Sequence, residues 1–507
     1  MKKATRNLII LAVCAAGLGT AAVLLSKGGG EGGASSSASA SSIQLVSKTS
    51  ADVASMKVTN KNGSYTLVPV EAKSAASSSD DEASSSSGSS SSSAPAVTYT
   101  VQELGGIPID TGETSSVVQN GFSLVATKNL GTVSDTEDFG LSKPQATVEV
   151  RFKDGTSFNY KIGNATATDS SAYYMSGANS NNVYVVAIDQ GLLEGAKYFV
   201  SKTILSIAPP ASSSSSAAEG ENDFSRIALS GTSFPQQVIM EKQGAALAIT
   251  SPGAYQTDST KLSGMEAALT TLTADSVEAV NPDAAALIKY GFDKPAVVAD
   301  YTVNNGRYRL LVGAQSGSKY YVMLGGVNVV YSVTSDNVGA VAEQNLFSMR
   351  SKLILTPGIE TVKSIEFTRG AETDTVDVAR TQSASSAASS SASSGSQKTY
   401  SYTVAGNGGK KLNYDTNYKH FYEKLIGVEL LEDTGAKPAG TPVLAVRYSY
   451  FDKASTDTVE FYQADSRRYL AVLNGVPYGN VVSTDVSAVV SELADLENGK
   501  SIPDPNP

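Results

Sequence analysis

The side chains that most often carry out chemistry in proteins are scarce in this chain. Its 507 residues include one histidine, His420, and one cysteine, Cys14. A serine-type catalytic triad would have to use His420, and a zinc site would have to be built almost wholly from carboxylates. A lone cysteine permits neither an intrachain disulfide nor a thiolate metal site. We therefore expect no catalytic residues, no metal site and no cofactor, and we interpret the protein as a non-enzyme.

Tyrosines are the strongest candidates for a binding surface, because they recur in pairs at matching spacings. The candidate ligand or partner surface consists of Tyr173, Tyr174, Tyr184, Tyr320, Tyr321 and Tyr331. Exposed rings of this kind can stack on a ligand. Strand alternation favours a structural alternative, in which one ring of each pair packs in the core and the other covers the face of the sheet.

Other polar residues have weaker claims to a site, and a structural interpretation is favoured for each. Lys143 and Lys294 share a position and could contact an anion, but we favour a solvated lysine beside a turn. The acidic run at 80–82 lacks the spaced ligands of a calcium loop. His420 is expected to be a partly exposed helix residue. The sequon at 164–166 is a weak signal for glycosylation. Paired carboxylates for a hydrolase, a remote alternative, are not identifiable from one sequence.

The elements that must position the tyrosines occur twice. Tyr290-Gly291-Phe292-Asp293-Lys294-Pro295 has an earlier copy in Phe139-Gly140-Leu141-Ser142-Lys143-Pro144. In the later copy Asn281 is the expected N-cap of a short helix, and Gly291 its terminating C′ glycine. Strands with period-two patterning and glycine turns follow in both copies, which predicts an antiparallel meander.

A hairpin and a helix are expected before the later meander. Residues 238–249 read as strand, tight glycine turn and strand. Apolar residues recur at helical spacing over 262–272, where Ser263 and Glu266 could form a capping box.

A third, degenerate copy follows. It opens at 362–367, has a helical face around Phe421 and closes with a helix over 486–493, but Thr441-Pro442-Val443 replaces the Tyr-Gly-Phe element. The fold class expected is therefore α+β, with an N-terminal transmembrane helix and three tandem repeats of antiparallel meander plus helix.

Ser-rich tracts interrupt the chain at 74–95, 211–222 and 383–397. Such composition buries too little apolar surface to offset the entropy of ordering, so we expect disorder. Strands flank the first and third tracts, which we interpret as enlarged hairpin loops. Lengthening a loop costs only about 0.6 kcal/mol per doubling. The middle tract is interpreted as a linker.

The N-terminus predicts a membrane anchor. Lys2, Lys3 and Arg6 precede the apolar run from Leu8 to Leu25. As a helix this run would span roughly 27 Å, and the positive flank predicts export of the remaining chain. A cleaved signal peptide and lipidation at Cys14 remain alternatives.

These observations predict the following organisation: tip and anchor 1–27, linker 28–42, repeat 1 at 43–208 with insert 74–95, linker 209–223, repeat 2 at 224–355, repeat 3 at 356–500 with insert 381–397, and tail 501–507.

Composition excludes some partners. The net charge is −10 and the isoelectric point about 4.9. Binding to nucleic acid needs a basic patch, and no lysine or arginine run occurs outside the N-terminus.

The ordered set of motifs resembles the bacterial family called domain of unknown function 4340. The order is Tyr/Phe-Gly, Pro, a strand, a glycine turn, a strand ending in Ile/Val-Gly, then Tyr-Tyr and Val-Tyr. The resemblance covers 100–206 and 224–355, and is weaker over 358–498. It implies a membrane-anchored extracytoplasmic protein, often encoded near ABC transporter components, and supplies no catalytic residues.

We therefore expect a single-pass protein of the cell membrane whose C-terminal region is extracytoplasmic. It would act as a binding or scaffold subunit, accessory to an ABC-transporter-like envelope complex. The alternative is a cell-wall or surface-glycan binding protein.

Overall fold

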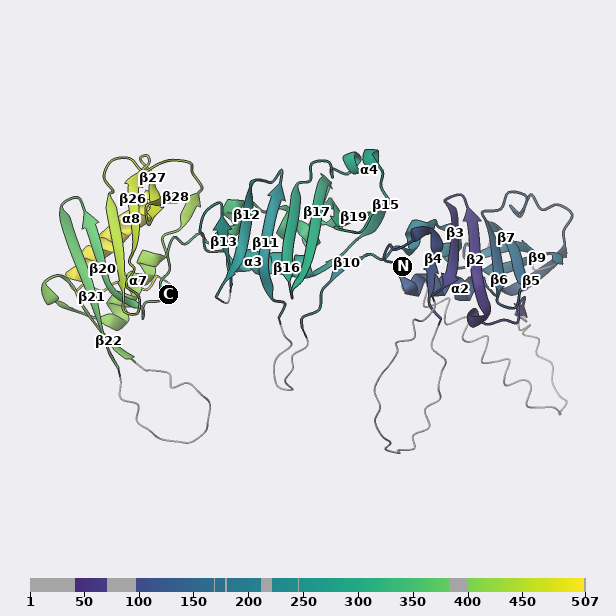
Figure 1. Ribbon diagram of the computed structural model, residues 1–507, viewed down its shortest axis with the longest axis horizontal. Helices are drawn as coiled ribbons and strands as arrows, with labels where there is room; N and C mark the ends of the chain where they lie inside the picture. Colours follow the sequence, from purple (N-terminus) through teal and green to yellow (C-terminus); the bar gives the residue numbers. More distant parts are fainter. Residues whose placement is uncertain are drawn as a thin grey trace, which may run out of the picture. The chain divides into compact units, whose positions relative to one another are not determined.

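Three large antiparallel sheets dominate the protein (Figure 1). The computed structural model describes residues 42–70, 97–167, 169–177, 180–210, 221–244, 246–382 and 400–505. The predicted anchor, Cys14 and nearly all of the linker 28–42 lie outside the described residues. So do the Ser-rich tracts, apart from residues 221 and 222. Among the described helices, none is long and apolar enough to cross a membrane.

The first sheet has nine strands in the order β1-β5-β9-β8-β7-β6-β2-β3-β4. Their bounds are β1 Ile43–Gln44, β2 Val53–Asn60, β3 Gly63–Pro69, β4 Tyr99–Val101, β5 Val125–Thr132, β6 Ala146–Phe152, β7 Ser157–Ala165, β8 Ala172–Gly177 and β9 Ser180–Ala187; the helices are α2 Thr111–Gly121 and the short 3-10 turns η3 Gln190–Leu193 and η4 Ala196–Phe199. Pairing of β3 with β4 confirms that the strands flanking the first Ser-rich tract form a hairpin.

The second sheet has eight strands in the order β13-β12-β11-β16-β17-β18-β19-β15. Their bounds are β11 Phe224–Gly231, β12 Phe234–Gln243, β13 Ala246–Ser251, β15 Ser276–Val280, β16 Val297–Val303, β17 Gly306–Ser316, β18 Lys319–Leu324 and β19 Val329–Thr334; the helices are α3 Ser259–Thr270, α4 Ala284–Lys289, α5 Ser335–Ala342 and α6 Leu346–Met349. A separate ribbon pairs β10, Thr203–Ser206, with β14, Thr271–Thr273.

The third sheet has nine strands in the order β23-β22-β21-β20-β25-β26-β27-β28-β24. Their bounds are β20 Val362–Arg369, β21 Glu372–Gln382, β22 Tyr400–Ala405, β23 Lys411–Leu412, β24 Leu430–Glu432, β25 Leu444–Tyr450, β26 Asp457–Gln463, β27 Arg468–Leu473 and β28 Val476–Val482; the helices are the π-helical turn η6 Tyr414–Tyr418, α7 Lys419–Ile426 and α8 Ser483–Glu497. Here β21 pairs with β22 across the third tract, as predicted.

All three sheets share a core strand order. Each has three consecutive antiparallel strands, then a four-stranded meander, then one further strand beside it: β5, β15 or β24; the first sheet also has β1 beyond β5, and the third has β23 beyond β22. We call these three the closing strands. Antiparallel meanders with helices were expected, and this coarse fold class is confirmed.

The chain divides into two compact units, each made of three separate segments. The first compact unit comprises Met1–Ser206, Thr271–Pro295 and Leu310–Asn337, and the second comprises Ile207–Thr270, Ala296–Arg309 and Val338–Pro507. In the second unit, Phe367, Phe421, Tyr448 and Leu493 belong to one cluster of buried side chains. Strand alternation and the apolar face of α7 and α8 bring these residues together.

Two predicted caps are wrong, for the same local reason. Helix α3 begins at Ser259, where the Asp258 side chain accepts from the backbone N of Lys261 at 3.0 Å, so Ser263 lies inside the helix and forms no capping box. The cap of α4 is Asp283, whose side chain accepts from Ala286 N at 2.8 Å, and not Asn281. In both cases an aspartate closer to the first helical turn caps the free amides.

The predicted end of α4 is confirmed. Gly291 has φ +79°, Gly291 N donates to Ile288 O at 3.0 Å, and Phe292 N donates to Leu287 O at 2.8 Å. These are the two hydrogen bonds of a Schellman motif, which needs a residue of left-handed backbone at the glycine position.

The segments between sheets belong with the sheet that follows them. Thr203 pairs with Thr273, and Leu353 forms a bridge with Glu429, in each case just before the closing strand. The sequence analysis assigned both segments to the ends of the preceding repeats. These segments belong to the following sheets because they pair with residues far along the chain, and local sequence patterns do not predict such pairing.

Candidate functional site

The six tyrosines of the predicted surface differ sharply in exposure. Tyr173, Tyr184, Tyr320 and Tyr331 are buried. Burial raises the pKa of Tyr331 to about 12. Tyr174 and Tyr321 keep part of their surface. Four of the six therefore cannot offer a ring face to a ligand without opening the sheet, and a ligand role remains a prediction for Tyr174 and Tyr321.

The duplicated element packs on those two partly exposed rings. The Phe139 ring meets Tyr174 edge to face at 4.7 Å, and the Tyr290 ring meets Tyr321 in the same way at 4.6 Å. Such aromatic pairs contribute about 0.5–1.5 kcal/mol beyond their buried area. The connection that enters each meander therefore packs against the face of its sheet.

A glycine in the strand makes this close packing of the connection possible. Asn164 N donates to Phe139 O at 2.8 Å, and Ala314 N donates to Tyr290 O, also at 2.8 Å. The preceding residues are Gly163 and Gly313, where a Cβ atom would lie 2.1 and 2.3 Å from those same carbonyl oxygens. Only glycine permits this approach, so the repeated motif is a structural unit.

The remaining predicted positions are placed without surprise. Lys143 and Lys294 are exposed, as the solvated interpretation requires. His420 is partly buried on α7, and its Nδ1 donates to Ile502 O at 2.9 Å. Asn164 is exposed on β7. In the part of the chain that the structure describes, no group of His, Cys, Asp and Glu is placed to hold a metal ion.

A second set of tyrosines, in the third sheet, forms a row of ring contacts that the sequence analysis missed. We call Tyr402, Tyr414, Tyr418 and Tyr422 the tyrosine ladder. Tyr402 and Tyr414 stack at 5.5 Å with 10° between their planes, Tyr414 lies 5.8 Å from Tyr418, and Tyr418 lies 5.9 Å from Tyr422. Tyr402 and Tyr414 are partly exposed, whereas Tyr418 and Tyr422 are buried. The ladder therefore runs from the surface into the core.

Local structure explains the ladder. In β22, alternation puts Tyr400 and Tyr402 on the face of buried Val404. Tyr414, Tyr418 and Tyr422 recur every four residues along η6 and α7, which places them on one side of the helix. Both patterns were legible in the sequence, but their meeting required the pairing of β22 with β21.

Charged groups border the exposed end of the ladder. The Arg380 guanidinium lies 4.7 Å from the Tyr400 ring and 4.4 Å from the Phe451 ring, and it donates to Asp452 at 2.7 Å. Lys419 lies 5.1 Å from the Tyr414 ring. Burial raises the pKa of the Tyr414 hydroxyl, so it stays a neutral hydrogen-bond donor. Flat rings beside fixed donors and acceptors can bind a partner or a sugar ring.

A buried arginine forms a second unusual cluster. Arg350 follows α6 with its side chain 0% exposed, its guanidinium 3.8 Å from the Tyr255 ring and 4.5 Å from the Tyr478 ring. It donates to Tyr478 O at 2.6 Å and to Asp433 at 3.4 Å, while its Nε has no partner among the described residues. Its partners are fixed protein groups, and this cluster holds segments of the second unit together.

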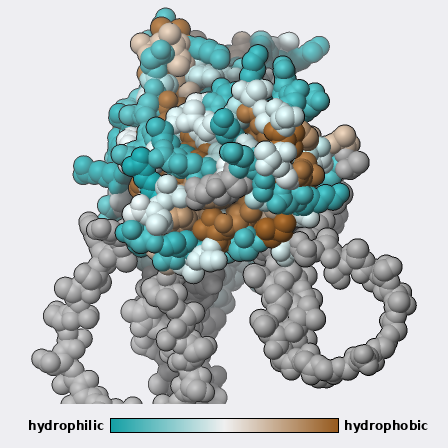
Figure 2. Space-filling model, turned by 90° about the vertical axis from the view of Figure 1, so that its right-hand side faces the viewer, coloured by the Kyte–Doolittle hydropathy of each residue, from teal (hydrophilic) through white to brown (hydrophobic). Residues whose placement is uncertain are grey.

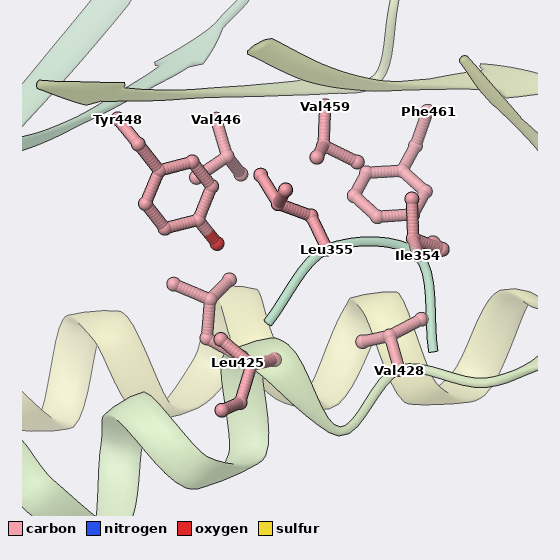
Figure 3. A pocket seen from close by; sticks show the side chains of 9 residues that line it. Ile354, Leu355, Leu425, Val428, Val446, Tyr448, Val459 and Phe461 are labelled. Atoms are coloured by element: carbon pink, nitrogen blue, oxygen red, sulfur yellow. The ribbon is translucent and has the colours of Figure 1, made fainter. Parts of the chain in front are cut away.

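A cavity in the core of the third sheet is too small for a ligand. Figure 3 shows its lining, in which Leu355, Leu425 and Phe461 converge and the Tyr448 hydroxyl points inward. Its volume is about 10 Å³, close to the room that a single water needs. We interpret it as a packing defect of the core.

Two carboxyl groups do approach each other in the third sheet. Asn407 donates to Asp374 at 2.6 Å and to Glu497 at 3.0 Å, and Arg369 forms an ion pair with Asp374. Burial and then Asp374 raise the pKa of Glu497. The network joins the end of α8 to β21, and both carboxyl groups have hydrogen-bond partners within it, whereas the buried Nε of Arg369 has none among the described residues.

Comparison with known proteins identifies the family. A family model described as Domain of unknown function (DUF4340) matches residues 94–230 and 248–431, which together are more than half of the chain. The chain therefore belongs to this family and carries two tandem matches, as the sequence analysis predicted. No curated protein and no solved structure matches. The first match ends inside β11 and the second begins at β13, so the family's boundaries are offset from those of the sheets.

Proposed function

We propose that this chain is a non-enzymatic, single-pass membrane protein whose extracytoplasmic part binds or scaffolds a partner complex. The apolar run from Leu8 to Leu25 would be the anchor. Three repeats of one unit would form the exported part, an interpretation supported by the strand order common to the three sheets. The family resemblance supports an accessory role beside an ABC-transporter-like complex.

The tyrosine ladder is the observation that carries the binding proposal. It presents Tyr402 and Tyr414 at the surface and continues into the core through Tyr418, so the outer rings are held rigidly. Rigid aromatic anchors lose little entropy on binding and are frequent hot spots of interfaces. Arg380 and Lys419 add charge beside them.

Capture from crosslinked membranes tests this proposal. The wild-type chain, a Tyr402→Ala/Tyr414→Ala variant and a Tyr308→Ala control would be isolated and their partners identified. Tyr308 is also partly exposed and stacked, on Tyr301 at 5.5 Å, but it lies in the second sheet. We expect loss of partners only with the ladder variant. Identical partners for all three proteins would contradict a role for the ladder, and no partner at all would contradict the scaffold.

The anchor is tested separately. Membrane fractionation should place the full chain in the membrane pellet. Protease added to protoplasts or spheroplasts should degrade the C-terminal region. Release of the chain by high salt, or protection of the C-terminal region, would contradict this topology.

A cell-wall or surface glycan is the second candidate ligand, and the parallel Tyr402–Tyr414 stack favours it. Sugar rings present an apolar face that packs on aromatic rings, and their hydroxyls need nearby donors and acceptors. Retention on purified peptidoglycan, lost in Tyr402→Ala and kept in Tyr308→Ala, would support this ligand. If wild type and both variants all pass through a peptidoglycan column without retention, a cell-wall glycan is contradicted as the ligand.

A further inference from the structure

The two outer rings of the tyrosine ladder meet the geometric requirements of an oxidative crosslink. The ring centroids of Tyr402 and Tyr414 lie 5.5 Å apart with 10° between the ring planes, and both residues are partly exposed. They belong to different elements, β22 and η6, so a covalent bond between the rings would tie these elements together. Such a bond, between ring carbons of two tyrosines, is called dityrosine.

Every other contact between two tyrosine rings in the described part of the chain includes a buried ring. The buried members are Tyr301 beside Tyr308, Tyr290 beside Tyr321, Tyr478 beside Tyr255, and Tyr418 beside Tyr414 and Tyr422. A buried phenol cannot meet an oxidant in solution or pass its proton to water. Among these contacts, only the pair of Tyr402 and Tyr414 combines ring contact with partial exposure of both rings.

In the first sheet, two tyrosines contact phenylalanine rings instead. Tyr65 meets Phe199 at 4.9 Å, and Tyr174 meets Phe139 at 4.7 Å. A phenylalanine ring has no hydroxyl proton to lose, so these contacts cannot yield a bond between two phenols. Figure 2, which looks toward this sheet, shows that apolar areas also reach its surface between polar ones. Exposure of apolar groups is therefore not what distinguishes the ladder.

Tyrosine is the main target for one-electron oxidants in the third sheet. Cysteine and methionine, which oxidants also attack, are absent from residues 351–507, and the whole chain has no tryptophan. No side chain of these three types therefore competes with the ladder in this part of the chain.

The buried half of the ladder directs oxidation outward. A phenol that loses an electron must also lose its proton, because a buried charge without a partner is unfavourable. The Tyr418 hydroxyl is buried and has no partner among the described residues, and the Tyr422 hydroxyl donates to Pro357 O at 2.7 Å, a carbonyl that cannot take up the proton. An oxidised inner ring is therefore expected to recover its electron from the outer pair, across contacts of 5.8 and 5.9 Å.

We propose that Tyr402 and Tyr414 form an oxidative modification site, at which a one-electron oxidant couples the two rings into dityrosine. The oxidant is of the class that haem peroxidases form from hydrogen peroxide. Nearly parallel rings can reach bonding distance by sliding over each other, and partial exposure leaves room for that movement.

The reaction removes one electron and one hydroxyl proton from each ring. The two resulting radicals join through a bond between the carbons next to the oxygen-bearing carbons. The hydrogen on each of these carbons then moves to the phenolic oxygen, so both hydroxyl groups are restored. Hydrogen peroxide accepts the two electrons and two protons and becomes two water molecules.

The crosslink requires no partner protein or ligand. The inference goes beyond the proposed function, from which it takes only the export of the chain to a compartment that oxidants reach. Its test uses the purified chain, so failure of the crosslink leaves the partner capture untouched, and the converse also holds.

Photo-oxidation of the purified full-length protein tests the inference. A ruthenium tris-bipyridine complex, excited by light, is the small oxidant, and persulfate takes up the two electrons to form two sulfate ions. We expect the peptides that contain residues 402 and 414 to appear as one linked species, two hydrogen atoms lighter than their sum. Chains with and without heavy nitrogen, mixed in equal amounts, show whether the link lies within one chain.

Variants that keep every ring in place make the result specific. Tyr402→Phe and Tyr414→Phe should each abolish the link. Tyr400→Phe and Tyr418→Phe each change another tyrosine of the same element, β22 or η6, and should preserve the link.

The stack of Tyr301 and Tyr308 is an internal control. It has the same 5.5 Å between ring centroids, but Tyr301 is buried and its hydroxyl donates to Leu269 O at 2.8 Å. We expect no link there. Absence of the link between residues 402 and 414, an equal yield at 301 and 308, or links only between differently labelled chains would each overturn the inference.

Discussion

In the first two sheets and in the third, different residues cover the same position on the face of the sheet. In the first two, an aromatic residue of the connection lies over a strand glycine and against a tyrosine of the next strand. The register shows what changed in the third. Ala146 pairs with Ile162 before Gly163, whereas Leu444 pairs with Phe461 before Tyr462. Tyr462 therefore stands at the glycine position.

The tyrosine and the connection changed together with the glycine. Leu470 pairs with Tyr462 and occupies the place of Tyr174 and Tyr321, and Thr441-Pro442 replaces the aromatic-glycine pair. In the first two sheets the ring comes from the connection and the strand leaves room for it. In the third the strand supplies the ring, so the connection needs none. The three positions form one unit that is kept or lost as a whole.

Gly313→Ala should have the largest effect on this comparison. The new Cβ would lie 2.3 Å from Tyr290 O, which is backbone and cannot swing away. We expect a loss on the order of 3 kcal/mol in stability of the second sheet. Hydrogen exchange of the β16–β18 amides in guanidinium would measure it. Gly435→Ala is the matched control, since a Cβ there meets nothing within 4 Å. Equal protection of the β16–β18 amides in both variants would contradict the requirement for glycine at position 313.

Tyr290→Ala should cost nearly as much, about 3 kcal/mol, because it removes a buried ring. A double-mutant cycle with Tyr321→Ala isolates the ring pair, and we expect a coupling of about 1 kcal/mol. Hydrogen exchange of the β16–β18 amides in guanidinium is again the measurement. Additive effects of the two substitutions would show that the rings do not act as a pair.

Tyr462→Ala should cost less, about 1 kcal/mol, because this ring covers Leu470 but remains partly exposed. Protection of the β26–β27 amides is the readout. A loss as large as that of Tyr290→Ala would mean that the third sheet depends on its aromatic cover as strongly as the second. Tyr462→Phe should be neutral and serves as the control.

The smallest effect concerns pH and the third sheet alone. Burial and the neighbouring Asp374 raise the pKa of Glu497, while Arg369 and Lys410 oppose the shift. A raised pKa means that the folded state favours the protonated acid. The stabilising contribution is therefore complete below the usual range of a glutamate and is lost as pH rises through the raised pKa.

Glu497→Gln should remove this slope. Unfolding of wild type and variant would be followed by exchange at α8 amides across the acidic range. Parallel curves for the two proteins would contradict the assigned shift. The first two sheets should show no difference between wild type and variant, because the groups described as interacting with Glu497, namely Asp374, Arg369, Asn407 and Lys410, belong to the third sheet and its connections.

Much of the fold was predictable from particular residues. Alternating apolar residues and glycine turns predicted the meanders, and Gly291 with Pro295 predicted how α4 ends. Flanking strands revealed that tracts 74–95 and 383–397 interrupt hairpins. Helix starts were less predictable, because Asp258 and Asp283 compete with nearby Ser263 and Asn281 for the same capping role.

The candidate sites were less predictable than the fold. The tyrosines at 173, 174, 320 and 321 stood out as pairs, yet pairing on a strand guarantees that one of them faces the core. Tyr402 and Tyr414 did not stand out, because they lie on different elements and each looks ordinary alone. Arg350 likewise resembles any polar residue after a short helix.

The sequence by itself determined the repeated unit, the family and the order of elements, since these depend on local patterning and on glycines that no other residue can replace. Tertiary structure alone decided which rings are buried and which segments before each sheet pair with it. The physical reason is that exposure and strand pairing depend on partners distant in the chain, and local preferences carry no record of them.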